Sequence, residues 1–362
     1  MMQISPETQL FIREHSSDDV RVLALQAKKY PDIDMPTAIT QIAGRKVAAE
    51  KIPSWWEIEK IWYPKHLSLE QCSSEITARY KARLLQGDSL TDLTGGFGID
   101  CSFLATGFKS ATYVERQEEL CEIAAHNFPV LNLNHINIKN EDGVTYLQVM
   151  SPVDCLFLDP ARRNEHGGKT VAISDCEPNV AELEELLLQK ANRVMIKLSP
   201  MLDLSLALKE LKQTQEVHIL SVNNECKELL ILLGQTSPAE ISIHCVNLFT
   251  KGTQKEQHFV FTREQEQCSE CTYTDSLETY LYEPNASLLK AGAFRSIAAA
   301  YPVRKLHPNS HLYTSDTFIE NFPGRIFRIV NQCSFNKKEV KENLADLKKV
   351  GRPAVMMAFV PA

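Results

Sequence analysis

Short apolar runs alternate with amphipathic helical patterns over residues 89–234, and this alternation constrains the fold more than any other feature. Strands that are joined by helices pair in parallel with right-handed crossovers, so the pattern predicts a doubly wound α/β sheet. The last two runs, in EVHILSVNNECKELLILLG, leave no room for a helix between them and predict a hairpin. Seven strands are expected in all, and EISIHCVNLF and EQHFVFTRE are expected to continue the same sheet.

The two ends of the chain do not follow this alternation of strands and helices. Residues 1–66 carry apolar residues at three- and four-residue spacings and predict an N-terminal helical domain. The tryptophans of PSWWEIEKIWYP are expected to pack small helices together, and the alternative is that they stack on nucleobases. Residues 67–270 are expected to form the α/β domain, which begins with one helix over residues 67–85. Residues 271–362 are expected to form a small α+β domain, with mainly helical structure over SLETYLYEPNASLLKAGAFRSIAAAY and a helix over NKKEVKENLADLKK.

The stretch LTDLTGGFGID, residues 90–100, reads as the end of the first strand, a glycine turn and the start of a helix. Gly95, Gly96 and Gly98 let a ligand approach the backbone closely. Cys101 stands where a dinucleotide-binding fingerprint has its third glycine, and Asp92 would place a carboxylate toward a pyrophosphate. That carboxylate is better placed to hold the α-ammonium of a methionine group, although a dinucleotide remains an alternative.

Two further acids follow the next two strands at the edge where ligands bind in open parallel sheets. Glu115 ends the second strand, about twenty residues after the glycines, where a carboxylate accepts hydrogen bonds from both ribose hydroxyls of a nucleoside. Asp142 follows the third strand, where an acid can accept a hydrogen bond from an adenine amino group. Both positions indicate a nucleoside, but neither one distinguishes between cofactors.

The segment DCLFLDPARR is an apolar strand that ends in Asp159 and Pro160. An Asp-Pro turn at the end of the fourth strand is typical of enzymes that methylate amino groups or nucleobases. Asp159 could accept a hydrogen bond from a target amine, and Pro160 would fix the turn. The alternative is that Asp159 only caps the element that follows.

Together, DLTGGFG, YVE, EDG and LDPAR resemble the class I S-adenosylmethionine-dependent methyltransferases. The segments LEQCSSEITARYKA, DLTGGFGID, FLDPARR, YEPNASLLKAGAF and KLHPNSHLYTSD more narrowly resemble a bacterial subgroup with a C-terminal THUMP-like domain. The resemblance implies a Rossmann-like seven-stranded methyltransferase sheet, S-adenosyl-L-methionine as cofactor and, by analogy alone, an RNA substrate.

The resemblance also implies which residues form the site. Catalytic roles fall to Asp159, Pro160 and Arg162. Cofactor contacts fall to residues of the glycine loop, of the two strand ends and of the helix before the loop: Asp92, Thr94, Gly95, Gly96, Phe97, Gly98, Asp100, Glu115, Asp142, Gln71, Ser74 and Thr77. In relatives of this type that helix borders the methionine pocket, and Gln71, Ser74 and Thr77 lie at helical spacing.

The chain departs from the family's patterns at the Asp-Pro turn. Ala161 and Arg162 stand where amino-methylating enzymes usually have proline and an aromatic residue that stacks on the flipped base. DPAR is also similar to the DPPR of 5-methyluridine methyltransferases, but VMIKLSPML after the fifth strand contains no cysteine nucleophile. The expected reaction is therefore direct transfer to nitrogen.

Composition sets further limits. The net charge is −7, but residues 275–362 carry a charge of +4 and the remainder −11, so the C-terminal part is compatible with phosphate contacts. Lys290, Arg295, Arg304, Lys305 and His307 are the candidates for such contacts. No run of eighteen apolar residues and no signal peptide is visible, and most of the ten cysteines sit singly in apolar segments. Cys268 and Cys271 form a lone C-x-x-C in an expected linker, with no second pair at zinc-ligand spacing. We therefore expect a cytoplasmic protein that has no membrane or DNA partner and no metal site.

Three alternatives remain at this point. A dinucleotide-dependent oxidoreductase would share the glycine turn and Glu115. A methyltransferase that acts on a small molecule or a protein would share the whole cofactor site. A non-catalytic RNA-binding protein with this fold would retain the architecture, and the missing aromatic after Pro160 is compatible with that alternative.

Overall fold

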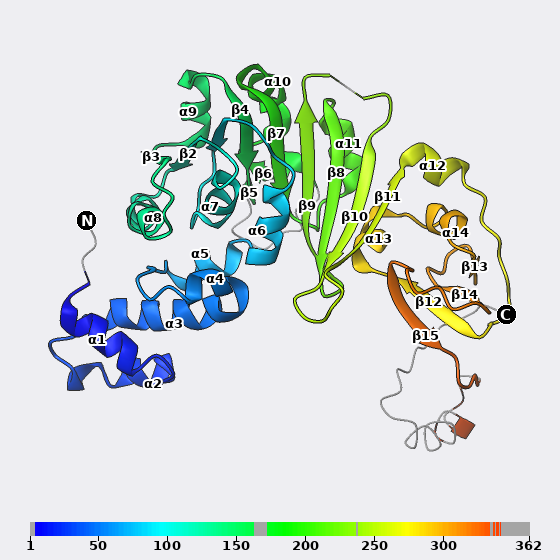
Figure 1. Cartoon of the computed structure of the whole chain (residues 1–362), viewed down its shortest axis with the longest axis horizontal. Helices are drawn as coiled ribbons and strands as arrows, with labels where there is room; N and C mark the ends of the chain where they lie inside the picture. Colours follow the sequence, from blue (N-terminus) through cyan, green and yellow to red (C-terminus); the bar gives the residue numbers. More distant parts are fainter. Residues whose placement is uncertain are drawn as a thin grey trace. The chain divides into compact units, whose positions relative to one another are not determined.

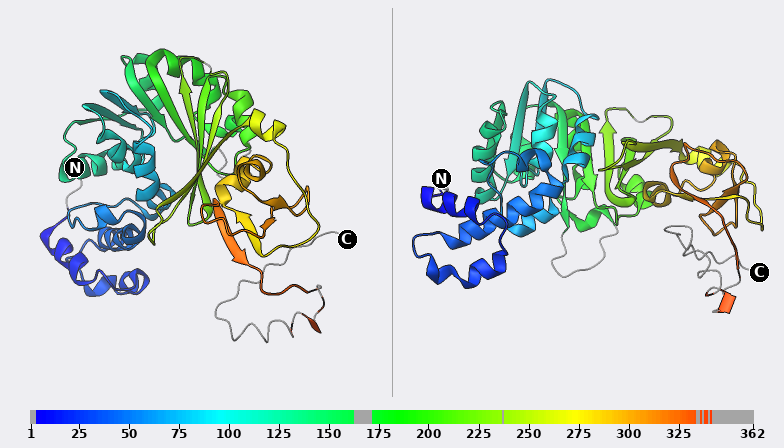
Figure 2. Two further views of the ribbon diagram at one scale, coloured as in Figure 1. Left: turned by 45° about the vertical axis from the view of Figure 1, so that its right-hand side comes forward. Right: turned by 60° about the horizontal axis from the view of Figure 1, so that its bottom comes forward.

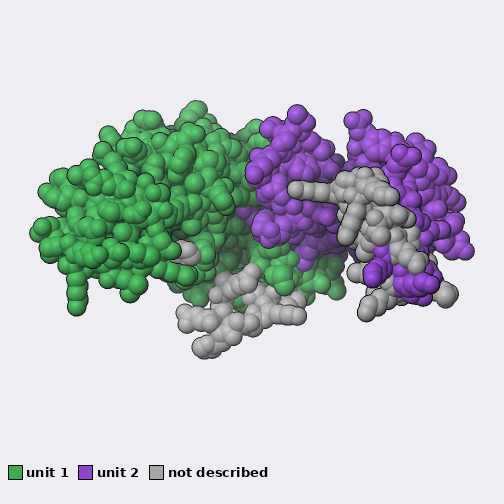
Figure 3. Space-filling view, turned by 90° about the horizontal axis from the view of Figure 1, so that it is seen from below, with its two compact units in different colours: residues 1–215, 230–237 green, residues 216–229, 238–362 purple. Residues whose placement is uncertain are grey.

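A computed structural model describes residues 4–162, 172–236, 238–333, 336, 338–339 and 341 of the 362-residue chain. The chain divides into two compact units: unit 1 comprises residues 1–215 and 230–237, and unit 2 comprises residues 216–229 and 238–362 (Figure 3). The described residues include no helix that combines the length and the apolar character needed to cross a bilayer.

The N-terminal part of unit 1 is helical, as the sequence predicts. Its elements are α1 (Pro6–Glu14), α2 (Val20–Leu25), η1 (Ala27–Lys29), α3 (Met35–Lys51) and α4 (Pro53–Trp56). Both α1 and α2 pack on α3, and the two views of Figure 2 show these three helices (blue) side by side. Phe11, Leu23 and Ile42 form the centre of the small apolar core between them.

The remainder of unit 1 alternates strands and helices (Figure 1). The strands are β1 (Ser89–Asp92), β2 (Ser110–Glu115), β3 (Ile136–Asn140), β4 (Val153–Leu158) and β7 (Ala191–Leu198). They pair in parallel in the order β3-β2-β1-β4-β7, with Asp92 in register with Tyr113 on one side and Phe157 on the other. The carboxyl ends of β1, β2 and β4 therefore lie together.

Among the described residues, five helices follow these strands along the chain, and three of them begin at a side-chain cap. They are α7 (Ile99–Ala105), α8 (Glu118–Val130), α9 (Gly143–Val149), α10 (Val180–Lys190) and α11 (Leu204–Glu210). The side chains of Asp142, Asn179 and Asp203 accept hydrogen bonds from the first backbone N–H groups of α9, α10 and α11. Each cap of this kind stabilises a helix by about 0.5–2 kcal/mol.

The sheet continues through β8 (Thr214–Val222), β9 (Glu225–Gly234), β10 (Ser242–Leu248) and β11 (Glu256–Thr262), giving the strand order β11-β10-β8-β9-β7-β4-β1-β2-β3. The two-residue turn between β8 and β9 consists of Asn223 and Asn224, which both have positive φ, as a tight hairpin turn requires. The predicted class I methyltransferase sheet is thus confirmed, and the two expected additional strands bring the described sheet to nine.

Unit 2 also contains a small sheet of four strands in the order β13-β14-β12-β15. Its elements, with the helices before and within it, are α12 (Arg263–Cys268), β12 (Tyr280–Pro284), α13 (Ala286–Ala291), α14 (Ser296–Ala300), β13 (Arg304–Lys305), β14 (Tyr313–Ser315) and β15 (Gly324–Arg328). The prediction of mainly helical structure from residue 276 was wrong at β12, where alternating Tyr and Leu form the central strand. Most of the helix expected over NKKEVKENLADLKK lies outside the described residues.

The single helix expected over residues 67–85 is in fact two helices, α5 (His66–Gln71) and α6 (Glu75–Ala82). The chain between them is extended at Cys72 and Ser74. The break turns Ser73 into the interior, where it is only 4% exposed. The prediction of helical structure was correct on both sides of the break, but the sequence Cys-Ser-Ser ends α5 and leads into α6.

Aromatic residues join the N-terminal helices to the α/β part of unit 1. Trp55 is buried and contacts Phe97 edge-on, with ring centroids 5.2 Å apart. The backbone N–H of Trp62 donates to Asn127 Oδ1 at 2.9 Å, and Asn127 Nδ2 donates to the Trp62 carbonyl at 2.8 Å. The Trp62 ring also stacks on His126. The packing role predicted for this tryptophan cluster is therefore confirmed for Trp55 and Trp62.

We predict that Asn127→Ala lowers the free energy of unfolding by about 2–4 kcal/mol, because it leaves the backbone N–H and carbonyl of Trp62 without their partner. The exposed Asn134 is the matched control, and its replacement by Ala should change stability by less than about 0.5 kcal/mol. Urea denaturation of both variants measures the difference. Equal stabilities would show that Asn127 does not anchor the N-terminal helices.

Candidate active site

The glycine loop after β1 is held tightly against β2. The Gly95 N–H donates to the Val114 carbonyl at 2.8 Å, and the Tyr113 hydroxyl donates to the Gly96 carbonyl. A Cβ atom at Gly95 would lie 2.2 Å from the Tyr113 ring, so no larger residue fits there. Gly96 and Gly98 have φ values of +54° and +86°, which favour glycine. The backbone of the loop is therefore fixed: the Tyr113 ring lies against Gly95 and the Phe128 ring against Gly98, whereas no side chain lies close to Gly96.

Asp92 lies at the base of this loop and is 1% exposed. Its Oδ1 accepts a hydrogen bond from the Thr94 N–H at 3.0 Å, whereas its buried Oδ2 has no hydrogen-bond partner among the described residues. Burial raises the pKa of Asp92 well above its ordinary value, and the neighbouring carboxyls of Asp100, Asp159 and Glu115 raise it further. A buried acceptor without a partner is costly, and such a group commonly marks a ligand position.

Glu115, at the end of β2, supports the loop directly. Its Oε2 accepts a hydrogen bond from the Gly96 N–H at 2.9 Å, and its Oε1 accepts one from the Gln117 N–H at 2.8 Å. The side chain is only 8% exposed. Because each carboxylate oxygen has a second lone pair, Glu115 can still accept hydrogen bonds from a ligand.

Asp142 occupies the corresponding place after β3. Its Oδ1 accepts hydrogen bonds from the backbone N–H groups of Val144 and Thr145 and thereby caps α9. The residue is exposed. Asp142 is thus an N-cap in any case, and its Oδ2 is the atom through which it could also meet a ligand.

Thr94 connects the glycine loop to the Asp-Pro turn that follows β4. The Asp159 N–H donates to Thr94 Oγ1 at 2.6 Å, which fixes the end of β4 beside the end of β1. Pro160 is buried. The backbone of Arg162 pairs with that of Cys176 in the short ladder of β5 (Ala161–Arg162) and β6 (Cys176–Glu177). The Arg162 side chain lies outside the described part of the structure.

The carboxylate of Asp159 is held by a lysine from the neighbouring strand. Lys197 Nζ lies 2.5 Å from Asp159 Oδ2 and 3.6 Å from Asp100 Oδ2. Desolvation raises the pKa of Asp159, and the Lys197 ammonium opposes that rise. The side chain of Asp159 remains 36% exposed, so it is within reach of a substrate.

Asp100 is the centre of a buried ionic network that extends from this pair. Lys81 Nζ lies 2.9 Å from Asp100 Oδ1, and the Ser73 hydroxyl donates to Asp100 Oδ2 at 2.7 Å. Lys81 also donates to Ser73 Oγ at 2.8 Å and is fully buried. Although burial alone would raise the pKa of Asp100, Lys81 and Lys197 lower it. Asp100 is therefore held as a carboxylate by the two lysines and Ser73.

Sequence reasoning missed Lys81, Lys197 and Ser73. Lys197 had a usable signal, because it stands within the apolar strand RVMIKLS, whose carboxyl end lies next to that of β4. Lys81 had none, because a lysine in the helical sequence ITARYKA normally faces solvent. Ser73 could not be found because the single-helix prediction concealed the break before α6.

The remaining predicted residues do not lie on one helix face. Gln71 is exposed at the end of α5, Ser74 is the N-cap residue of α6, and Thr77 is buried in α6. The Ser74 and Thr77 hydroxyls lie 3.2 Å apart. The ring of Phe97 packs in the core with Trp55, so Phe97 can meet a ligand only through its backbone.

Comparison with solved structures places this arrangement in a family. A protein of Porphyromonas gingivalis W83, described as a "putative methyltransferase", is 34% identical, with 97% of this chain and 87% of that chain covered and a TM-score of 0.82. The chain belongs to the family of this protein. The chain shares its methyltransferase fold with this protein over nearly its whole length.

Other comparisons add less. A family of ferredoxin-like domains matches residues 280–323, which contain β12 to β14, and the predicted THUMP-like character gains no support from that match. A "putative methyltransferase" from Streptococcus mutans in complex with SAH is 14% identical, and the match covers 44% of this chain and 96% of that chain. An rRNA methylase from Streptococcus thermophilus is 15% identical, and the match covers 44% of this chain and 93% of that chain. Both have TM-scores of 0.32, which are too low to support an argument. No curated protein matches the sequence.

We predict that Asp92→Asn stabilises the ligand-free protein at neutral pH, because it removes a buried carboxyl whose pKa is raised in the folded state. A carboxyl with a raised pKa destabilises the fold as pH rises above its ordinary value, so the advantage of the variant should shrink as pH falls toward about 4. Melting temperatures of both proteins across this range measure the effect. A less stable variant at neutral pH would mean that Asp92 is satisfied in the free protein.

Proposed function

We propose that this protein is an S-adenosylmethionine-dependent methyltransferase that transfers a methyl group to a nucleobase nitrogen in structured RNA. The observation that carries the proposal is the buried Oδ2 of Asp92, an acceptor without a partner at the base of a glycine loop. An ammonium group is the natural partner of such an atom. A pyrophosphate would be repelled by it, and this favours a methionine-containing nucleoside over a dinucleotide.

The residues at the strand ends fit the other parts of S-adenosylmethionine. Asp92 would accept a hydrogen bond from the methionine ammonium group. Glu115 would accept hydrogen bonds from the ribose hydroxyls, and Asp142 would accept one from the adenine amino group. At Gly96 no side chain lies close to the backbone, which leaves room for a close approach of the ligand. When bound, the cofactor supplies an electrophilic methyl group on a sulfonium centre.

Charge supports the same cofactor. Four carboxyl and two ammonium groups meet at this edge of unit 1: Asp92, Asp100, Glu115, Asp159, Lys81 and Lys197. The net charge of the cluster is about −2 when all are ionised and about −1 when Asp92 is protonated. S-adenosylmethionine carries a net charge of +1, whereas a dinucleotide brings two negative phosphates. The electrostatic preference is therefore for the methyl donor.

Asp159 is the residue that would orient the acceptor. Its carboxylate is fixed by Lys197, remains partly exposed and follows the strand whose end contacts the glycine loop through Thr94. A carboxylate in this position accepts a hydrogen bond from an amino group and directs the nitrogen lone pair toward the methyl group. The rate gain comes mainly from holding the two reactants in line.

The RNA acceptor rests on the Asp-Pro turn and on the basic C-terminal residues. Arg295 and Arg304 are exposed, although Arg304 pairs with Glu278 and Arg295 also donates to the Gln267 carbonyl. Lys305 must be removed from the predicted phosphate contacts, because it is buried and donates to the carbonyls of His307 and Pro308. The acceptor therefore needs a direct experiment.

We predict that S-adenosylhomocysteine binds the protein and that its affinity falls as the pH is lowered, because the raised pKa of Asp92 makes this carboxyl take up a proton at a higher pH than an ordinary aspartate does. Isothermal titration over a series of pH values measures the change. Asp92→Asn should lose at least about tenfold in affinity and also lose the pH dependence. Binding of NADH in place of S-adenosylhomocysteine would contradict the cofactor assignment.

We also predict that Asp159→Ala abolishes transfer of a tritiated methyl group to total RNA from a strain that lacks the gene, while S-adenosylhomocysteine affinity changes by less than about threefold. Lys197→Met should lower kcat by about tenfold or more, and Lys197→Arg should restore part of it, because an arginine keeps the ion pair with Asp159. Circular dichroism checks that the variants fold.

The outcomes of this assay separate the remaining alternatives. Label in RNA that is absent with Asp159→Ala supports the proposal. Binding of S-adenosylhomocysteine without label in RNA would overturn the RNA acceptor and favour a small-molecule or protein substrate. RNA binding without any transfer would favour a non-catalytic role.

A further inference from the structure

A second cluster of ligating side chains lies in unit 2, on strands that the proposed methyl-transfer site does not use. Glu216 and His218 are two residues apart on β8, so their side chains lie on the same face of the sheet. His244, on the parallel strand β10, is directly in register with His218. Two positions on one strand and one on its neighbour therefore bring a carboxylate and two imidazoles together.

The distances within this cluster suit a metal ion. His218 Nε2 and Glu216 Oε2 are 3.2 Å apart, and one ligand atom from each of the three residues lies within 4.8 Å of the others. Bonds of about 2.0–2.2 Å to a tetrahedral Zn²⁺ place neighbouring ligand atoms about 3.4 Å apart. The rings of His218 and His244 are stacked, with centroids 4.3 Å apart, so side-chain rotation has to turn the two nitrogens toward each other.

Two neighbours orient His244. His258 on β11 brings its Nε2 to 3.2 Å from His244 Nδ1, and Ser242 Oγ lies 3.2 Å from His244 Nε2. If His244 Nδ1–H donates to His258, the lone pair of His244 is on Nε2, where it accepts from the serine hydroxyl. A metal-ligating histidine typically donates its other ring N–H to such a partner, which fixes its tautomer.

We propose that Glu216, His218 and His244 form a Zn²⁺ site, with His258 as the hydrogen-bond partner of His244. A set of two histidines and one glutamate is a donor set that zinc uses, with water as a fourth ligand. Sequence analysis could not find this site, because its residues come from two separate strands and match no contiguous metal-binding motif.

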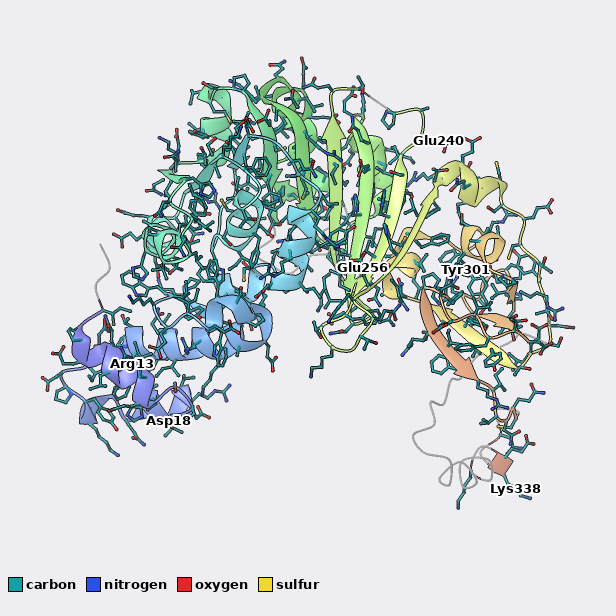
Figure 4. All side chains as sticks on the ribbon, viewed as in Figure 1. Arg13, Asp18, Glu240, Glu256, Tyr301 and Lys338 are labelled. Carbon is teal, nitrogen blue, oxygen red and sulfur yellow. The ribbon has the colours of Figure 1, made fainter. Side chains whose placement is uncertain are left out.

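The position of the cluster indicates a role in stability. His218 is the middle residue of β8, and His244 is the third residue of β10, whose start lies near Glu240 and whose far end lies near Glu256 in Figure 4. The cluster therefore lies within the strands, whereas the proposed methyl-transfer site uses residues at strand ends. The ion would link β8 to β10 and, through His258, to β11.

The proposal is tested with the full-length, chelator-treated protein and Zn²⁺ alone. We expect about one Zn²⁺ per chain by isothermal titration, a rise in melting temperature with Zn²⁺, and the visible absorption of tetrahedral Co²⁺ when cobalt replaces zinc. His244→Ala should weaken Zn²⁺ binding at least about tenfold and remove both the thermal shift and the cobalt absorption. Glu216→Gln, which keeps the size of the side chain, is the second variant should His244→Ala not fold.

His15→Ala is the matched control. His15 is also paired with a carboxylate, since its Nδ1 lies 2.6 Å from Asp18 Oδ2, but no second imidazole or thiol makes a metal-ligating group with it in the described structure. This variant should keep the stoichiometry, affinity and thermal shift of the parent protein. Absence of Zn²⁺ binding, or binding that survives both His244→Ala and Glu216→Gln, would overturn the proposal. Neither result depends on methyl transfer.

Discussion

The ion pairs around Asp100 are the interaction on which the geometry of the candidate active site depends. Lys81 comes from α6 and Lys197 from β7, and both ammonium groups meet Asp100 in the first turn of α7. Buried charges are stable only when they are paired and hydrogen-bonded. The network therefore holds α6, which precedes the glycine loop, and α7, which follows it, in fixed positions relative to β7.

The break between α5 and α6 has its physical reason in this network. Ser73 donates its hydroxyl hydrogen to Asp100 and accepts a hydrogen bond from Lys81, which requires its side chain to point inward. In a continuous helix over residues 67–85, helical periodicity alone would decide the direction in which the Ser73 side chain points. Here the demand for buried hydrogen-bond partners outweighs local helix propensity.

The parallel sheet and the acids at its strand ends could be predicted because both follow from local patterns. Apolar runs mark β1, β2 and β4, and the residue that ends each run must lie at the carboxyl edge of a parallel sheet, as Asp92, Glu115 and Asp159 do. The partners of these acids could not be predicted. Lys81 looks like a surface lysine, and the Tyr-Leu alternation of β12 was hidden among helix-forming residues. Such features depend on which segments meet, and a single sequence does not contain that information.

Glu115 shows how recognition and scaffold are combined in one side chain. The carboxylate that is expected to meet a ribose already holds the Gly96 N–H and so shapes the loop that would lie against the methionine end of the same ligand. The two ends of the cofactor would thus be recognised by parts of the protein that are mechanically connected. A loss of affinity after substitution of Glu115 would consequently report the collapse of the loop as much as the loss of a sugar contact, and the two effects can be separated only by ligands that lack the ribose hydroxyls.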